Sequence, residues 1–160
     1  MWATLRSGDD LARLWFDCVL GWTLLALGWI DWEHMILPDA LTLPLIPLGL
    51  AATAWTGAPE TNLDHAAATL VGYVAFRAVS AAYRRLRGRD GLGEGDAKLL
   101  AAGGAWLGLS GLAPMILLGA TSGLLLAGLQ ALRGRPVSAT TALPFGTNLA
   151  FGFWLLRLYG

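Results

Sequence analysis

Apolar segments of about the length of a lipid bilayer recur along the chain and are separated by short polar loops. The first covers residues 12–30 and, at about 1.5 Å per helical residue, spans about 28 Å, close to the hydrocarbon thickness of a membrane. The sequence therefore predicts an all-α, polytopic membrane protein, one domain over residues 1–160 with about six transmembrane helices. The expected helices cover residues 12–30, 40–55, 65–83, 97–109, 112–132 and 143–158.

The composition is poor in charge, which supports the membrane assignment. Only 14% of the residues are charged, against about 25% in soluble domains. Lys plus Arg and Asp plus Glu each number 11, so bulk charge gives no argument for a nucleic-acid partner. The single cysteine, Cys18, excludes an intrachain disulfide and a cysteine-based zinc site. Neither His34 nor His65 has a second histidine at metal-ligand spacing, so we expect no metal and no cofactor.

Two acidic residues lie at the boundaries of apolar segments. Asp31 ends the first segment, within Trp-Ile-Asp-Trp-Glu-His-Met-Ile-Leu-Pro-Asp (residues 29–39). Asp96 belongs to Gly-Leu-Gly-Glu-Gly-Asp-Ala-Lys (residues 91–98), where the glycines would let another backbone approach closely. An ionisable group at the mouth of a membrane segment is costly and therefore a functional candidate. We interpret Asp31 and Asp96 as a catalytic pair; the alternative is a flexible polar loop without chemistry.

When two carboxyl groups are close together, they do not both ionise easily, so one keeps its proton. The pair then provides an acid and a base at the same time. The base deprotonates a water molecule that attacks a peptide carbonyl. The acid polarises that carbonyl and later protonates the leaving amine. This chemistry requires neither a metal nor a covalent intermediate.

The basic residues divide unequally between the two membrane faces. The loops after the first, third and fifth segments, with the start of the fourth, carry seven of them, against three on the opposite face. The positive-inside rule places the seven-residue face in the cytoplasm, and Asp31 and Asp96 both lie on that face. The first set is Arg84, Arg85, Arg87, Arg89, Lys98, Arg133 and Arg135, and the second is Arg6, Arg13 and Arg157.

Two stretches of the sequence resemble the signatures of type IV prepilin peptidases, which are GxGD-type intramembrane aspartic proteases. Residues 29–39, followed by Leu-Thr-Leu-Pro at 41–44, resemble the first signature, and Gly-Glu-Gly-Asp-Ala-Lys-Leu-Leu at 93–100 resembles the second. Leu-Pro-Phe-Gly at 143–146 is similar to a third, weaker family feature. The resemblance implies an enzyme of the bacterial cytoplasmic membrane that removes the short basic leader from prepilins of type IV pili or pseudopilins of type II secretion.

The resemblance also implies roles for individual residues. Asp31 and Asp96 would be catalytic, Gly93 and Gly95 would shape the loop, and Lys98 would be a supporting position. Asp39 belongs to the first signature and is interpreted as a helix cap or a supporting acid. The alternative that Asp39 rather than Asp31 is catalytic stays open.

Longer members of the family carry a further membrane segment and a cytoplasmic domain ahead of this core, often with paired cysteines that bind zinc. They also methylate the new N-terminus with S-adenosylmethionine. This chain begins almost at the core and lacks such cysteines. We therefore expect a short form that cleaves leaders, with methyl transfer absent or supplied by a partner.

Two other classes of function compete with the peptidase. In a small transporter, Asp17, Arg77 and Asp96 would form an ion or proton path, and a helix broken at Pro44 and Pro47 would suit it. A non-catalytic scaffold of a pilus or secretion machine would keep the fold without activity. Of the three, only the peptidase would release a leader from a prepilin peptide.

Overall fold

A computed structural model of the chain describes residues 8–56, 59–88, 93–133 and 144–159, and the secondary structure of this part is helical. Three helices contain stretches long and apolar enough to cross a membrane, Leu11–His34, Glu60–Arg87 and Glu94–Leu132, and Asp39–Trp55 is a shorter apolar one. The expected all-α, polytopic membrane fold is confirmed, whereas the count of six helices is not. The helices are α1 (Gly8–His34), α2 (Asp39–Thr56), α3 (Pro59–Arg87), α4 (Glu94–Leu132) and α5 (Phe145–Tyr159).

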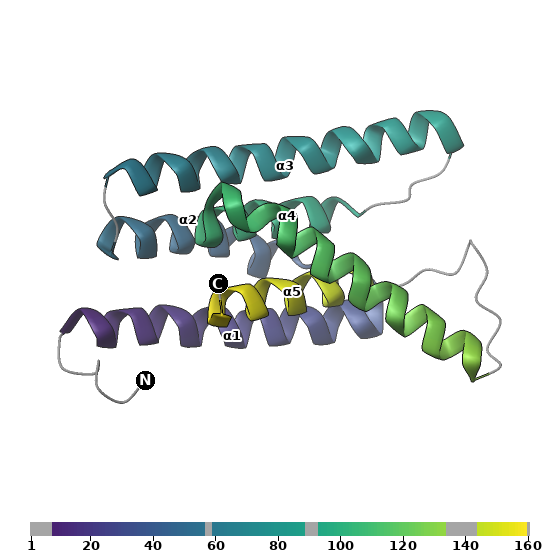
Figure 1. Ribbon diagram of the computed structural model, residues 1–160, viewed down its shortest axis with the longest axis horizontal. Coiled ribbons are helices and arrows are strands. Elements are labelled where there is room, and N and C mark those ends of the chain that lie inside the picture. The colour runs from purple at the N-terminus through teal and green to yellow at the C-terminus, as the bar shows by residue number, and fades with distance from the viewer. Residues whose placement is uncertain (1–7, 57–58, 89–92, 134–143, 160) are drawn as a thin grey trace.

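The difference in helix count arises at Gly108, where α4 breaks into two stretches. Gly108 has φ 71° and ψ −174°, a conformation that L-residues with a side chain rarely adopt. A side chain at Gly103 would meet Met115, so the two stretches fold back on each other, as Figure 1 also shows. The backbone N–H of Leu109 donates to the Asp64 carboxylate at 3.0 Å, which caps the second stretch. The expected helices at 97–109 and 112–132 are thus joined into one broken element.

The first stretch of α4 lies in the middle of the molecule because its small residues let α3 approach closely. A Cβ atom at Gly104 would meet the backbone of Ala68, and one at Gly72 would meet the carbonyl of Leu100. Small residues at helix contacts are typical of membrane proteins. Figure 1 shows α3 along one edge and α1 along the other, with α2, the first stretch of α4 and α5 between them.

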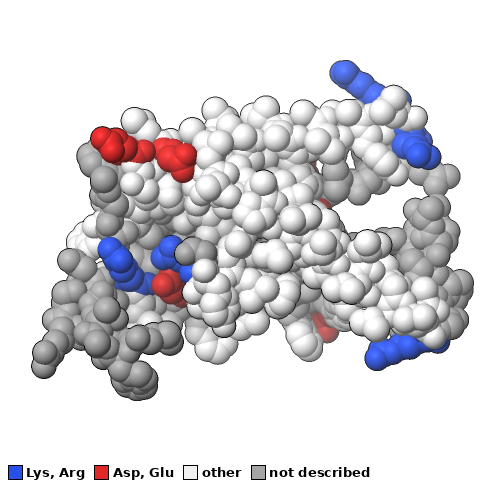
Figure 2. All heavy atoms as spheres, in the orientation of Figure 1, with Lys and Arg blue, Asp and Glu red and all other residues white. Residues whose placement is uncertain are grey.

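The outer surface is suited to lipid. Large apolar side chains such as Trp22, Leu25, Leu70 and Leu124 are exposed on α1, α3 and α4. In the view of Figure 2, charged side chains gather toward two ends of the molecule, and the surface between them is mostly uncharged. Arg84, Arg85 and Arg87 end α3, and Arg133 follows α4; the expected positions 6, 89 and 135 lie outside the described residues.

Polar contacts join the helices at the end remote from Arg133. Arg157 of α5 donates from Nε to Asp17 of α1 at 2.8 Å and lies over the ring of Trp106, 5.5 Å from its centroid. His65 donates from Nδ1 to the carbonyl of Ala105 at 2.9 Å, tying α3 to α4. Asp17 therefore has a structural partner at this end of the bundle.

Candidate active site

Asp31 lies on a helix, not in the loop that the sequence predicted. The apolar run ends near residue 30, but the backbone of α1 continues to His34 and ends at Met35, which has φ 55°. The Asp31 side chain is buried, with 5% of the residue surface exposed. The helical extension points this carboxylate inward because it keeps Asp31 on the same face as the buried Leu24 and Leu27.

The start of α5 holds the Asp31 carboxylate. Asp31 Oδ2 accepts a hydrogen bond from the backbone N–H of Thr147 at 2.7 Å, and the Thr147 hydroxyl oxygen lies 3.1 Å away. The carboxylate thus occupies the N-terminal end of a helix, where free N–H groups and the helix dipole stabilise negative charge.

Close approach between Asp31 and α5 depends on Gly146. A Cβ atom at this position would lie 2.9 Å from Asp31 Cγ and from Asp31 Oδ2. Gly146 and Thr147 were not among the residues expected to form the site. Pro144 and Gly146 belong to the third signature, and the helix start that they mark was the available signal; Leu143 lies outside the described residues.

Asp96 lies in the first turn of α4, which begins at Glu94 and not at Ala97 as expected. It is 8% exposed, and its Oδ2 accepts from the backbone N–H of Gly93 at 3.2 Å. Gly95 is therefore helical, and a Cβ atom there would meet Leu37. Residues 91 and 92 of the glycine-rich octapeptide lie outside the described residues.

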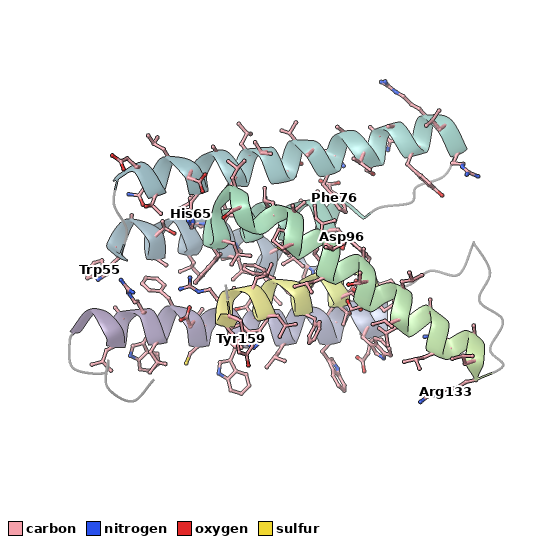
Figure 3. The ribbon with its side chains drawn as sticks, viewed as in Figure 1. Trp55, His65, Phe76, Asp96, Arg133 and Tyr159 are labelled. Carbon is pink, nitrogen blue, oxygen red and sulfur yellow. The ribbon has the colours of Figure 1, made fainter. Side chains whose placement is uncertain are left out.

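The fold brings Asp31 and Asp96 together in one pocket. Both line a cavity of about 290 Å³, and their carboxylates are close enough to repel each other electrostatically. Figure 3 shows Asp96 in the interior, between α3 and α5. When two carboxyl groups are buried close together, the state with one of them protonated is favoured over the state with both ionised. The remaining lining residues are Met35, Ile36, Leu37, Asp39, Gly93, Glu94, Gly95 and Lys98.

A chain of ion pairs forms one wall of this cavity. Lys98 donates to both carboxylate oxygens of Asp39, at 2.8 and 2.9 Å, and lies 3.4 Å from Glu94. Glu94 in turn lies 3.8 Å from Arg77 of α3. Asp39 is the first residue of α2, and its carboxylate binds Lys98, a contact that fits the interpretation as a supporting acid and not the one as a helix cap. The wall fixes the start of α4 against α2 and α3.

The contact with Arg77 also sets the depth of the pocket. Arg77 lies ten residues before the end of α3 at Arg87, so α3 extends about 15 Å beyond the point where α4 begins. The carboxylate pair is therefore recessed from the end of the helical assembly.

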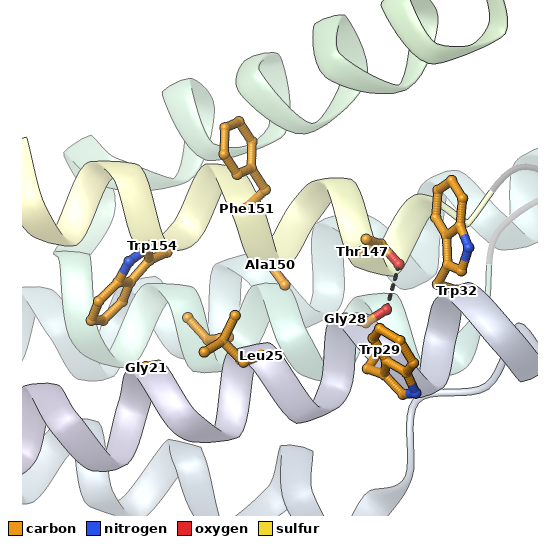
Figure 4. A pocket seen from close by; sticks show the side chains of 10 residues that line it. Gly21, Leu25, Gly28, Trp29, Trp32, Thr147, Ala150, Phe151 and Trp154 are labelled. Carbon is orange, nitrogen blue, oxygen red and sulfur yellow. Dashed lines mark hydrogen bonds between the residues drawn. The ribbon is translucent and has the colours of Figure 1, made fainter. Parts of the chain in front are cut away.

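A second, apolar groove adjoins the carboxylate pair between α1 and α5. Its volume is about 410 Å³, and Gly28 and Thr147 are among the residues that line it (Figure 4). The hydroxyl oxygen of Thr147 lies 3.1 Å from Asp31, so this part of the groove is next to that acid. The remaining lining residues are Gly21, Leu24, Leu25, Trp29, Trp32, Ala150, Phe151 and Trp154. The site thus consists of a polar pocket, which contains the two acids, and an apolar groove between α1 and α5.

The chain matches the profile of a known protein family over more than half of its length. The profile of the type IV leader peptidase family matches residues 18–128, which include Asp31 and Asp96. No solved structure shows significant similarity to the chain. Among the described residues, no group of three or more His, Cys, Asp or Glu side chains is arranged to hold a metal ion.

Several curated proteins named prepilin leader peptidase/N-methyltransferase are similar to the chain. The protein from Xanthomonas campestris pv. campestris is 40% identical over 146 residues, which cover 89% of this chain and 49% of that protein. The protein from Dichelobacter nodosus is 39% identical over 153 residues, or 94% and 51% of the two chains. The protein from Pseudomonas aeruginosa is 39% identical over 142 residues, or 89% and 48%. The chain spans about half the length of these relatives.

Proposed function

The chain belongs to the type IV leader peptidase family, and we propose that it is an aspartic endopeptidase that removes leader peptides from type IV prepilins or type II secretion pseudopilins. The observation that carries this proposal is the convergence of Asp31 of α1 and Asp96 of α4 in one buried pocket. The protein is a multi-pass membrane protein. We place it in the bacterial cytoplasmic membrane with the pocket toward the cytoplasm, because the basic residues Arg84, Arg85 and Arg87 gather at that end.

In the proposed reaction, Asp31 is the base. Both acids lie at the N-terminal end of a helix, but two donors of Thr147 stabilise a negative charge on Asp31, whereas Asp96 receives one backbone N–H at the longer distance of 3.2 Å. The resting pair therefore has Asp31 ionised and Asp96 protonated. Asp31 takes a proton from water, and Asp96 polarises the scissile carbonyl and then protonates the leaving amine.

The apolar groove beside Asp31 supports a substrate that is itself held in the membrane. Apolar residues of that substrate would lie between α1 and α5, and its scissile peptide would reach the acids past Thr147. Gly93, Gly95, Asp39 and Lys98 shape the opposite wall, and we assign them supporting roles.

The transporter alternative is disfavoured by the partners of its candidate residues. Asp17 is bonded to Arg157, and Arg77 lies against Glu94. Asp31, which shares a pocket with Asp96, is 14 residues or about 21 Å from Asp17 along α1, so Asp17 and Asp96 do not lie on a contiguous polar path. A catalytically silent scaffold is disfavoured by the burial of two acids in one pocket, which is costly without a function.

Replacement of the two acids tests the proposal. Asp31→Asn and Asp96→Asn should each abolish leader cleavage by purified protein in membranes, and the double variant should be no worse than either single variant because the two residues act as one unit. Glu94→Gln is the matched control and should keep cleavage, since it lines the same pocket, the two-acid scheme needs no third carboxylate, and Gln keeps a side-chain oxygen for Lys98 and Arg77. Substantial turnover by either Asn variant, at equal membrane abundance, would contradict the assignment.

A further inference from the structure

The hydroxyl group of Thr147 lies between two acceptors. Its oxygen is 2.9 Å from the carbonyl oxygen of Gly28, a contact drawn in Figure 4, and 3.1 Å from Oδ2 of Asp31. A threonine hydroxyl has one hydrogen, so it donates to only one of the two at a time. The backbone carbonyl of Gly28 always accepts, whereas a carboxyl group accepts when ionised and can also donate when protonated.

We propose that Thr147 is a positioning residue whose hydroxyl group switches partner with the charge on Asp31. When Asp31 is ionised, the hydroxyl donates to Oδ2 and forms a charge-assisted hydrogen bond. When Asp31 is protonated, the hydroxyl donates to Gly28 and its oxygen is free to accept from the carboxyl group. The polar groups therefore keep hydrogen-bond partners in both states.

This switch rests on the proposed function, because the proposed base gains and loses a proton in each turnover. A buried polar group that loses its partner on protonation or ionisation would raise the energy of one state. The backbone N–H of Thr147 also donates to Asp31, and because a carboxyl oxygen accepts in both protonation states, this bond holds the carboxyl group in place throughout. The side chain supplies the adjustable bond and the backbone supplies the fixed one.

The charged groups around Asp31 come from two other helices. Asp96, Glu94 and Lys98 of α4 and Asp39 of α2 line the same cavity. The described part of α5 has one ionisable charged side chain, Arg157, and it pairs with Asp17 at the other end of the bundle. A change at Thr147 therefore alters hydrogen bonding to Asp31 without removing a charge from its surroundings.

Thr147→Val removes the hydroxyl group and nearly preserves the shape, whereas Thr147→Ser keeps the hydroxyl group. We expect Val to lower kcat for leader cleavage about tenfold with KM nearly unchanged, because the ionised base loses a charge-assisted bond. The acidic limb of its pH–activity profile should move to higher pH. Ser should restore both properties. Thr121→Val is the control, since Thr121 donates to the carbonyl of Leu117 on an exposed face of α4 and should leave both unchanged.

Infrared spectroscopy of the protein in membranes tests the switch without using peptidase activity. The C=O stretch of protonated Asp31, identified by its loss in Asp31→Asn, should lie at higher frequency in the Val variant than in the parent and the Ser variant, because the carboxyl group has lost a partner. Equal frequencies in all three would overturn the switch, as would Ser and Val variants with equally impaired kcat. A parent protein that cleaves no leader would contradict the proposed function alone, and the infrared comparison would still decide the role of Thr147.

Discussion

Gly146→Ala is the smallest change that should displace the proposed base. The added Cβ atom would lie 2.9 Å from Cγ and Oδ2 of Asp31, whereas ordinary van der Waals contact begins near 3.4 Å. The carboxyl group must therefore withdraw by about half an ångström, which is the difference between these two distances. Leu37 blocks another direction, because its Cδ1 would be 2.7 Å from the new atom.

The expected magnitude follows from what the displacement breaks. Asp31 is bonded at 2.7 Å to the N–H of Thr147, the residue next to the substitution, so withdrawal from Gly146 also stretches that bond. Overpacking of this kind costs about 1–3 kcal/mol of folding free energy. A misplaced catalytic group also slows the reaction, and we expect kcat/KM for leader cleavage to fall about a hundredfold, which corresponds to about 2.7 kcal/mol of transition-state stabilisation.

The assay compares cleavage rate and thermal unfolding of Gly146→Ala with those of Gly128→Ala. A Cβ atom at Gly128, within α4, would meet no atom within 4 Å, so this control should keep full activity and gain up to about 1 kcal/mol from helix propensity. Full activity of the Gly146→Ala protein would refute the argument that close contact between α5 and Asp31 is required. Equal losses in both variants would show that the contact with Asp31 is not the cause, because Gly128→Ala makes no such contact.

Three further outcomes are expected. In a Cys18→Ser background, Leu86→Cys should be labelled by an impermeant thiol reagent only from the cytoplasmic side, and Leu63→Cys only from outside. Leu86 and Leu63 are 85% and 74% exposed and lie 23 positions, or about 34 Å, apart on α3. The reverse labelling pattern would contradict the proposed orientation. Asp39→Asn should lower leader cleavage only a few-fold, because it weakens one ion pair in which the Asp39 side chain is 56% exposed and leaves Lys98 its contact with Glu94; abolished cleavage would transfer the catalytic role to Asp39. The pH–activity profile of the parent should be bell-shaped, with both limbs belonging to the carboxylate pair; a flat profile in folded protein would argue against a shared proton.

The membrane class and the placement of the two acids at one membrane face could be predicted, because apolar length and the distribution of basic residues are read directly from the sequence. Apolar length predicts a membrane helix, and the charge asymmetry put Asp31 and Asp96 at one end before any contact was known. Helix boundaries were harder, because the backbone of α1 continues through the polar residues 31–34 that a hydropathy criterion excludes. The same limit made Gly95 look like a loop residue, although it packs within the first turn of α4 against Leu37.

The contacts that complete the site could not be predicted because they depend on tertiary structure. In the sequence, Thr147 is a polar residue in a mostly apolar helix, and nothing near it indicates a partner on α1. The reversal at Gly108 is equally hidden, since its cap comes from Asp64 on a different helix. Asp39 and Lys98 belong to the two family signatures, but the signatures do not indicate that these residues pair, because the pairing requires α2 and α4 to lie side by side.

The position of α5 in the chain has a consequence for biosynthesis. The groups that hold Asp31 reside on a helix that leaves the ribosome after α1 to α4, so a nascent chain has both acids in place well before Asp31 is held for chemistry. Gly146 and Thr147 then act as a late assembly step, and hydrolytic competence would appear only when α5 packs against α1. The proposed protease would therefore stay silent while it is still being inserted beside other newly made membrane proteins.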